Sequence, residues 1–217
     1  MRKEFLFAGS GGQGVITASI IFAEAAALKA GYHVVQSQSY GPEARGGSSS
    51  ASVVLNTIEV GYPKVIQPQV MICLTQEAFD KFSSGIRPGG LLLSDPFYVR
   101  RLGRLDARVR LLPMYEAVRD RVGLPITFNV CVLGALVGLV DVVRPEHVKA
   151  VISDRVPARF LDPNLQAFEI GLELAAGAKP IPRLRSGPPP SPPDPVGASC
   201  DQGCVPPARL DESTGSR

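Results

Sequence analysis

Short apolar runs alternate with longer segments of helical periodicity along residues 1–178. The apolar runs predict strands because they are short and rich in Val, Leu, Ile and Phe. Strands are expected at residues 5–8, 33–39, 50–56, 70–74, 91–94 and 109–112, and helices at 15–29, 76–84, 114–122, 128–140, 145–153 and 163–176. This alternation is typical of an α/β fold with a Rossmann-like start, in which helices cover both faces of a parallel or mixed sheet.

A glycine-rich loop joins the first expected strand to the first expected helix. It reads Gly9-Ser10-Gly11-Gly12-Gln13-Gly14. Backbone N–H groups and the positive end of the helix meet at such a turn, which is where α/β proteins hold phosphates. The candidate contact residues of this loop are Gly9, Gly11, Gly12, Gln13 and Gly14, and we expect a flexible polar tip at Gly12 and Gln13.

A second glycine-rich loop follows the second expected strand. Its candidate contact residues are Tyr40, Gly41, Pro42, Glu43, Arg45, Gly46 and Gly47. We expect it to lie beside the first loop, because the carboxyl ends of parallel strands meet at one edge of a sheet. Arg45 is the strongest candidate, since a guanidinium binds a phosphate or carboxylate in a bidentate fashion. The alternative for Arg45 is an internal ion pair with Glu43.

The spacing of Gly9, Gly11 and Gly14 matches the G-x-G-x-x-G fingerprint of dinucleotide-binding domains. Such a site also needs an acidic residue roughly 20 positions further on, to bind the ribose hydroxyls. The second expected strand instead ends in Gln36-Ser37-Gln38-Ser39. Three interpretations therefore remain: a nicotinamide or flavin site, glycines that only form the turn, and a loop that contacts another ligand or a partner chain.

The two loops together resemble the gamma subunit of 2-oxoacid:ferredoxin oxidoreductases. The resemblance continues through Tyr62-Pro63-Lys64-Val65, Arg87-Pro88-Gly89-Gly90 and the segment that begins Asn129-Val130-Cys131, so that it spans about residues 2–176. The Tyr-Pro pair is more similar to the 2-oxoglutarate members than to the pyruvate, 2-oxoisovalerate or indolepyruvate members. Asn129 itself is expected to cap a helix.

The resemblance implies a subunit of an enzyme complex, and not an enzyme that is active alone. Complexes of this family oxidatively decarboxylate a 2-oxoacid with thiamine diphosphate, Mg²⁺ and [4Fe–4S] clusters, and they transfer the acyl group to coenzyme A. The alpha and beta subunits hold the thiamine diphosphate, so this chain is expected to bind no cofactor alone. The implied partners are those two subunits and a ferredoxin-like delta subunit or a ferredoxin. The two loops would help to close the active site and to bind coenzyme A.

Composition sets the limits of the domain. The chain has 217 residues, 45% of them hydrophobic, and a net charge of +3, which gives no reason to expect binding to nucleic acid or to a membrane surface. Residues 1–178 are expected to form one domain, and residues 179–217 a disordered tail that holds half of the chain's 20 prolines. The start of the chain lacks a leader pattern, so a cytoplasmic location is expected.

The remaining reactive residues do not form a catalytic or metal-binding motif. Cys73 and Cys131 lie in apolar segments and are expected in the core, whereas Cys200 and Cys204 form a free pair in the tail. His33 and His147 are expected at the surface. A basic run, made of Arg100, Arg101, Arg104, Arg108 and Arg110, is interpreted as a solvated face, with docking of an acidic partner or of coenzyme A phosphates as the alternative.

Overall fold

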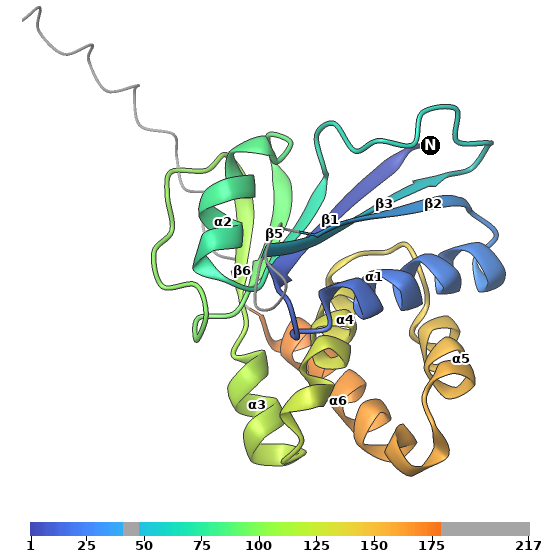
Figure 1. Ribbon diagram of the computed structural model, residues 1–217, viewed down its shortest axis with the longest axis vertical. Coiled ribbons are helices and arrows are strands. Elements are labelled where there is room, and N and C mark those ends of the chain that lie inside the picture. Colours follow the sequence, from blue (N-terminus) through green and yellow to red (C-terminus); the bar gives the residue numbers. More distant parts are fainter. Residues whose placement is uncertain (41–47, 179–217) are drawn as a thin grey trace, which may run out of the picture. The chain divides into compact units, whose positions relative to one another are not determined.

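The computed structural model describes residues 1–40 and 48–178, which belong to one compact unit (Figure 1). Its centre is a six-stranded sheet with the order β2-β3-β1-β4-β5-β6. The strands are β1 (Lys3–Ser10), β2 (His33–Tyr40), β3 (Ser48–Asn56), β4 (Val70–Cys73), β5 (Gly90–Ser94) and β6 (Ala107–Leu111). Every strand expected from the apolar runs is present, with ends that differ by at most two residues.

The sheet is mixed because β3 lies antiparallel between β1 and β2. The strands β1, β4, β5 and β6 run parallel to one another. The first two strands are therefore not neighbours, contrary to the simple parallel arrangement that we expected for the two loops. They still end at one edge, since β3 pairs Ser48 with Ser10 and Ser49 with Tyr40.

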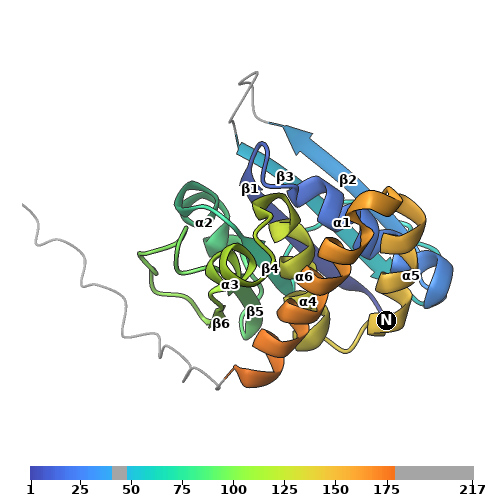
Figure 2. The ribbon, with the colours of Figure 1, turned by 90° about the horizontal axis from the view of Figure 1, so that it is seen from below.

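Helices cover the two faces unequally. They are α1 (Val15–Glu24), continued by the π-helical turn η1 (Ala25–Lys29), then α2 (Gln76–Phe82), α3 (Met114–Arg121), α4 (Phe128–Leu139), α5 (Pro145–Arg155) and α6 (Ala158–Gly177). Figures 1 and 2 show α1, α4, α5 and α6 on one side of the sheet and α2 on the other. Phe5, Phe7 and Phe22 belong to the larger core under α1 and α4, and Phe79 of α2 packs in a smaller core on the opposite face.

The helices α4 and α6 touch through glycines. A Cβ atom on Gly134 would lie 2.1 Å from the Phe168 carbonyl oxygen, and one on Gly171 would lie 2.1 Å from the Cys131 carbonyl oxygen. A Cβ atom on Gly138 would likewise lie 2.6 Å from the Ala175 Cβ. The close approach expected from the small residues of α4 is thus confirmed, and α6 is the neighbour.

The helix α6 begins earlier than the sequence indicates. It was expected to start at Pro163, because proline is favoured in a first helical turn and disfavoured inside a helix. The helix instead starts at Ala158 and passes through Pro163. The Asn164 side chain donates to the Phe160 carbonyl oxygen at 2.7 Å, so a carbonyl next to the interruption is satisfied locally. Within the described ranges, no helix is both long enough and apolar enough to cross a bilayer.

Candidate functional site

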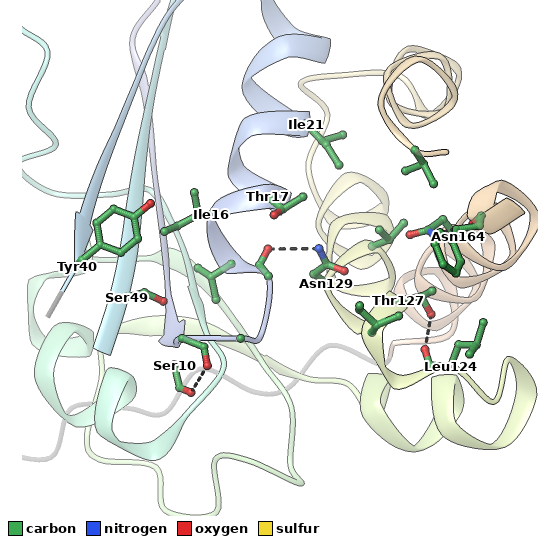
Figure 3. A pocket seen from close by; sticks show the side chains of 18 of the residues that line it. Ser10, Ile16, Thr17, Ile21, Tyr40, Ser49, Leu124, Thr127, Asn129 and Asn164 are labelled. Atoms are coloured by element: carbon green, nitrogen blue, oxygen red, sulfur yellow. Dashed lines mark hydrogen bonds between the residues drawn. The ribbon is translucent and has the colours of Figure 1, made fainter. Parts of the chain in front are cut away.

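A pocket of about 880 Å³ opens where β1, β2 and β3 meet α1 and the starts of α4 and α6 (Figure 3). Both glycine-rich loops contribute to it. Its lining residues are Ser10, Gly11, Gly12, Gly14, Val15, Ile16, Thr17, Ile21, Tyr40, Ser48, Ser49, Leu124, Ile126, Thr127, Asn129, Val130, Val156, Phe160 and Asn164. A cavity of this size is in the range that holds small molecules and cofactors.

The first loop is held in place by Gln13. Its Oε1 accepts from the Ser10 N–H at 2.8 Å, and its Nε2 donates to the Leu74 carbonyl oxygen, just after β4, at 3.0 Å. The side chain therefore ties the turn to the neighbouring strand. The expectation of a flexible tip is wrong at Gln13, because both ends of its amide are used inside the protein.

The glycines of this loop occur for different physical reasons. Gly12 and Gly14 have φ values of 94° and 69°, which favour glycine. A Cβ on Gly9 would lie 2.6 Å from Gln13 Oε1, so the amide of Gln13 fits only over a glycine. Gly11 lines the pocket directly. The interpretation of turn-forming glycines thus accounts for Gly9, Gly12 and Gly14, while Gly11 and Gly12 are exposed and line the pocket.

Asn129 closes the inner side of the loop. It is 8% exposed, and its Nδ2 donates to the Gly14 carbonyl oxygen at 3.4 Å. It does not cap α4, as we had expected from its position, because Thr127 is the residue before the helix and Asn129 is already inside it. Figure 3 shows the Asn129 amide between α1 and α4, facing the pocket.

The N-terminus of α1 points into the pocket. Gly14 is its N-cap residue and has no side chain to cap the helix, and Val15, Ile16 and Thr17 of the first turn line the cavity. The first N–H groups of a helix lack acceptors within the helix and carry a partial positive charge. This end of the pocket is therefore suited to bind a ligand through an anionic oxygen or a carbonyl oxygen.

The second loop reaches the pocket through its two ends. Tyr40, at the end of β2, is 69% exposed and donates its hydroxyl to Gln38 Oε1 at 2.7 Å. Ser48 and Ser49 line the pocket from β3. The other predicted residues of this loop, Gly41, Pro42, Glu43, Arg45, Gly46 and Gly47, lie outside the described residues.

The far wall of the pocket is apolar and was missed from the sequence. Leu124, Ile126 and Phe160 expose 39%, 82% and 40% of their surface, although all are large apolar side chains. They belong to the turn η3 (Pro125–Thr127), the residue before it, and the start of α6. In the sequence they are only apolar residues close to the start of a helix. Such residues are too common to identify a site.

The described part of the lining holds no acid, base or thiol. Its polar side chains are hydroxyls and amides, and Tyr40 is the one titratable residue. Among residues 1–40 and 48–178, His, Cys, Asp and Glu form no group that could hold a metal ion. The strand residue Gln36, where a dinucleotide site would need an acid, donates to Ser19 Oγ at 3.1 Å.

The other reactive residues lie away from the pocket. Cys73 and Cys131 are buried, as predicted, and burial raises the pKa of both thiols to about 12. His33 is exposed, whereas His147 is half-buried and lies 3.0 Å from Arg144. In the basic run, Arg100, Arg101, Arg104 and Arg108 are exposed and Arg110 is half-buried. Cys200 and Cys204 are outside the described residues.

Comparisons with known proteins point to one family. The model of the family "pyruvate ferredoxin/flavodoxin oxidoreductase" matches residues 4–174. The 2-oxoglutarate synthase subunit KorC of Methanocaldococcus jannaschii is 41% identical over 177 residues, covering 81% of this chain and 95% of KorC. A crystal structure of a keto/oxoacid ferredoxin oxidoreductase gamma subunit from Geobacter sulfurreducens is 39% identical, with a TM-score of 0.76, and covers 82% of this chain and 99% of that one.

A more distant structure shares the fold as part of a longer chain. The 2-oxoglutarate:ferredoxin oxidoreductase of Magnetococcus marinus is 24% identical, with a TM-score of 0.75, and the match covers 83% of this chain but 32% of that one. The family model, KorC and the Geobacter sulfurreducens structure confirm the resemblance to gamma subunits that the two loops indicated. The chain belongs to the pyruvate ferredoxin/flavodoxin oxidoreductase family.

Proposed function

We propose that the chain is the gamma subunit of a 2-oxoglutarate:ferredoxin oxidoreductase, and that it helps to close the active site and to bind coenzyme A. The 41% identity to a 2-oxoglutarate synthase subunit supports the substrate. The complex would contain alpha and beta subunits with thiamine diphosphate, Mg²⁺ and [4Fe–4S] clusters, and would pass electrons to a ferredoxin-like delta subunit or a ferredoxin. Its location would be cytoplasmic.

The pocket of about 880 Å³, lined by the first glycine-rich loop and by the two ends of the second, is the observation that supports this role. It offers N–H groups of α1, hydroxyls and amides at one end and apolar side chains at the other. Such a lining fits the uncharged pantetheine part of coenzyme A, which alternates amide groups with aliphatic carbon. The phosphates of coenzyme A need cationic partners, and Arg45 is the proposed one.

The large apolar side chains at the pocket rim would exclude water. Leu124, Ile126 and Phe160 are exposed in the isolated chain, and covering them against another subunit would be favourable. Thiamine diphosphate, when bound by the partner subunits, supplies the decarboxylation chemistry, which needs a water-poor cavity. The residues of this chain would therefore act by positioning coenzyme A and by keeping water out.

Reconstitution tests the proposal. The purified chain should be colourless and inactive, and should restore coenzyme A-dependent oxidation of 2-oxoglutarate when it is added to the purified alpha and beta subunits. Bound thiamine diphosphate or an iron–sulfur absorption spectrum in the isolated chain would contradict the division of roles. Saturable binding of a labelled nicotinamide nucleotide by the isolated chain would favour the dinucleotide interpretation instead.

Arg45→Ala tests the second loop within the reconstituted complex. Loss of a charge-assisted hydrogen bond, worth roughly 1.5–3 kcal/mol, should raise the KM for coenzyme A about tenfold or more. Arg45→Lys, which keeps the charge but not the bidentate geometry, should have an intermediate effect. Loss of assembly would place Arg45 at a subunit junction. Unchanged kinetics and assembly would leave the internal pair with Glu43, and a scaffold role for the loop, as the better explanation.

A further inference from the structure

The connection between β3 and β4, residues 57–69, is long and lacks regular secondary structure. Figure 1 shows it along the margin of the sheet, beside the N-terminus and away from α1 and α4. Long connections of this kind in compact domains are commonly functional. None of its residues lines the pocket of about 880 Å³.

A buried carboxylate holds the backbone of this connection through hydrogen bonds. Glu4 is 5% exposed, and its Oε2 accepts from the backbone N–H groups of Ile66 and Gln67 at 2.9 and 3.1 Å. Its Oε1 accepts from Arg2 Nε at 2.7 Å. A buried carboxylate with several donors holds its partners firmly, because losing any of them leaves a desolvated charge.

The guanidinium of Arg2 fixes the outer part of the same segment. Its two terminal nitrogens donate to the carbonyl oxygens of Tyr62 and Lys64 at 2.6 and 2.8 Å. The centre of the guanidinium also lies 6.0 Å from the Tyr62 ring. Arg2 and Glu4 therefore hold the backbone of residues 62–67 in one conformation.

This braced segment presents apolar side chains to solvent. Tyr62 and Ile66 are 52% and 70% exposed, and Ile58, earlier in the same connection, is 69% exposed. A flexible loop could fold such side chains inward, but a fixed backbone keeps them outside. Exposed apolar groups on a rigid support are typical of a preorganised protein-binding surface, since little conformational entropy is lost on binding.

Basic groups flank the apolar side chains. The Arg87 N–H donates to the Pro68 carbonyl oxygen at 3.0 Å, which joins the end of the connection to a neighbouring turn. There Lys3, Arg87 and Arg108 line a second pocket of about 310 Å³, and Asp141 is the one acidic residue in the described part of its lining. Within the described chain, neither Arg87 nor Arg108 forms a side-chain ion pair. The charge of this pocket is complementary to carboxylates.

We propose that residues 57–69 and this basic pocket form the docking surface for the alpha–beta subcomplex, which would cover Ile58, Tyr62 and Ile66 and insert a carboxylate beside Arg87. This inference rests on the proposed function. The partner is favoured because a domain of this fold makes up 32% of the longer Magnetococcus marinus chain and is there joined covalently to the rest of that chain. A separate chain needs a stable contact in place of that covalent link.

The position of this surface leaves the pocket of the glycine-rich loops free. Arg2 and Glu4 lie at the start of β1, whereas Ser10, which lines that pocket, is its last residue. At about 3.3 Å per residue, the strand separates the two sites by roughly 25 Å. Docking at this end of β1 therefore does not occupy the pocket at its other end.

Ile66→Asp in the full-length chain tests the apolar part. Leu28→Asp is the matched control, because Leu28 is also 70% exposed but lies in η1. The measurement is the Kd for the purified alpha–beta subcomplex, together with the melting temperature of each variant. Ile66→Asp should weaken binding by about tenfold or more without changing the melting temperature, whereas Leu28→Asp should bind as the wild type does.

Arg87→Glu tests the charged part, with Arg104→Glu as its control. Arg87→Glu should raise the Kd and weaken its dependence on salt, and Arg104→Glu should change neither. If the wild type binds the subcomplex but Ile66→Asp and Arg87→Glu bind equally well, the docking surface is wrong and the proposed function stands. If the wild type itself neither binds nor activates the subcomplex, both proposals are overturned.

Discussion

Asn129 Nδ2 and the Gly14 carbonyl oxygen form a 3.4 Å hydrogen bond between residues 115 positions apart. It joins α4 to the start of α1 at the edge of the pocket. The same amide occupies the space that a side chain at position 14 would need, since a Cβ there would lie 2.5 Å from Asn129 Nδ2. The loop and α4 therefore fit only with glycine at this position.

Gly14→Ala should destabilise the protein more than Gly12→Ala. Both positions have positive φ, which costs a residue with a Cβ about 1–2 kcal/mol. Only the Cβ at Gly14 also collides with Asn129, because nothing lies within 4 Å of one at Gly12. Denaturant unfolding of both variants measures the difference. Equal losses would show that Asn129 moves away at no cost.

Gln13→Glu should destabilise the first loop. The carboxylate can still accept from the Ser10 N–H, but it cannot donate to the Leu74 carbonyl oxygen. Its second oxygen would instead face that carbonyl oxygen and be repelled by it. We expect a loss of about 1–3 kcal/mol in the free energy of unfolding at neutral pH. Gln67→Glu is the control, since Gln67 is exposed. A stability equal to that of the control would show that the Gln13 amide is dispensable.

Asp95 predicts a pH-dependent stability. Its carboxylate is buried and accepts from the N–H groups of Phe97 and Tyr115 at 2.8 and 2.7 Å. Burial raises the pKa of Asp95, and the backbone donors only partly oppose this. The folded state thus keeps the Asp95 proton to higher pH than the unfolded chain does. The stability that this proton contributes is fully present in acid, and it is lost as pH rises from about 4 through the raised pKa.

Asp95→Asn removes this titration. The variant should be less stable overall, because its amide nitrogen cannot accept from the Tyr115 N–H. The stability advantage of the wild type over the variant should shrink as pH rises through the window above. Urea unfolding of both proteins between about pH 4 and 7 measures the difference. A difference that grows with pH would contradict the raised pKa.

Gly171→Ala should be strongly destabilising. Its Cβ would lie 2.1 Å from the Cys131 carbonyl oxygen, so α4 and α6 would have to separate. Overpacking of this kind costs about 1–3 kcal/mol or more. Gly177→Ala, at the end of the same helix, meets nothing within 4 Å and should be neutral or slightly stabilising. Thermal unfolding of the pair isolates the effect of contact between the helices.

Truncation after Ala178 should leave the domain intact. The composition of residues 179–217 does not allow a core, so the free energy of unfolding should change by no more than about 0.5 kcal/mol. Thermal and denaturant unfolding of the two chain lengths are the measurement. A large drop in melting temperature would show that the tail packs on the domain, and a defect in assembly alone would identify it as a docking arm.

The sequence alone determined the elements and the family. Periodicity located the strands and helices because burial of one face or of both faces leaves a local pattern of apolar residues. The small residues of α4 predicted a close neighbour, since only a missing side chain allows such contact. The two glycine-rich loops in register indicated the gamma-type resemblance that the comparisons confirmed.

The tertiary structure decided which residues share a site. Gln13 looks like a ligand-binding side chain in the sequence, yet it bonds to Leu74, whose position depends on the pairing of β1 with β4. The roles of Asn129 and Phe160 depend on how α4 packs against α1 and α6. The local sequence likewise gives no sign that β3 lies between β1 and β2 in the sheet. Contacts between segments distant in sequence leave no periodic signal, so only the folded arrangement reveals them.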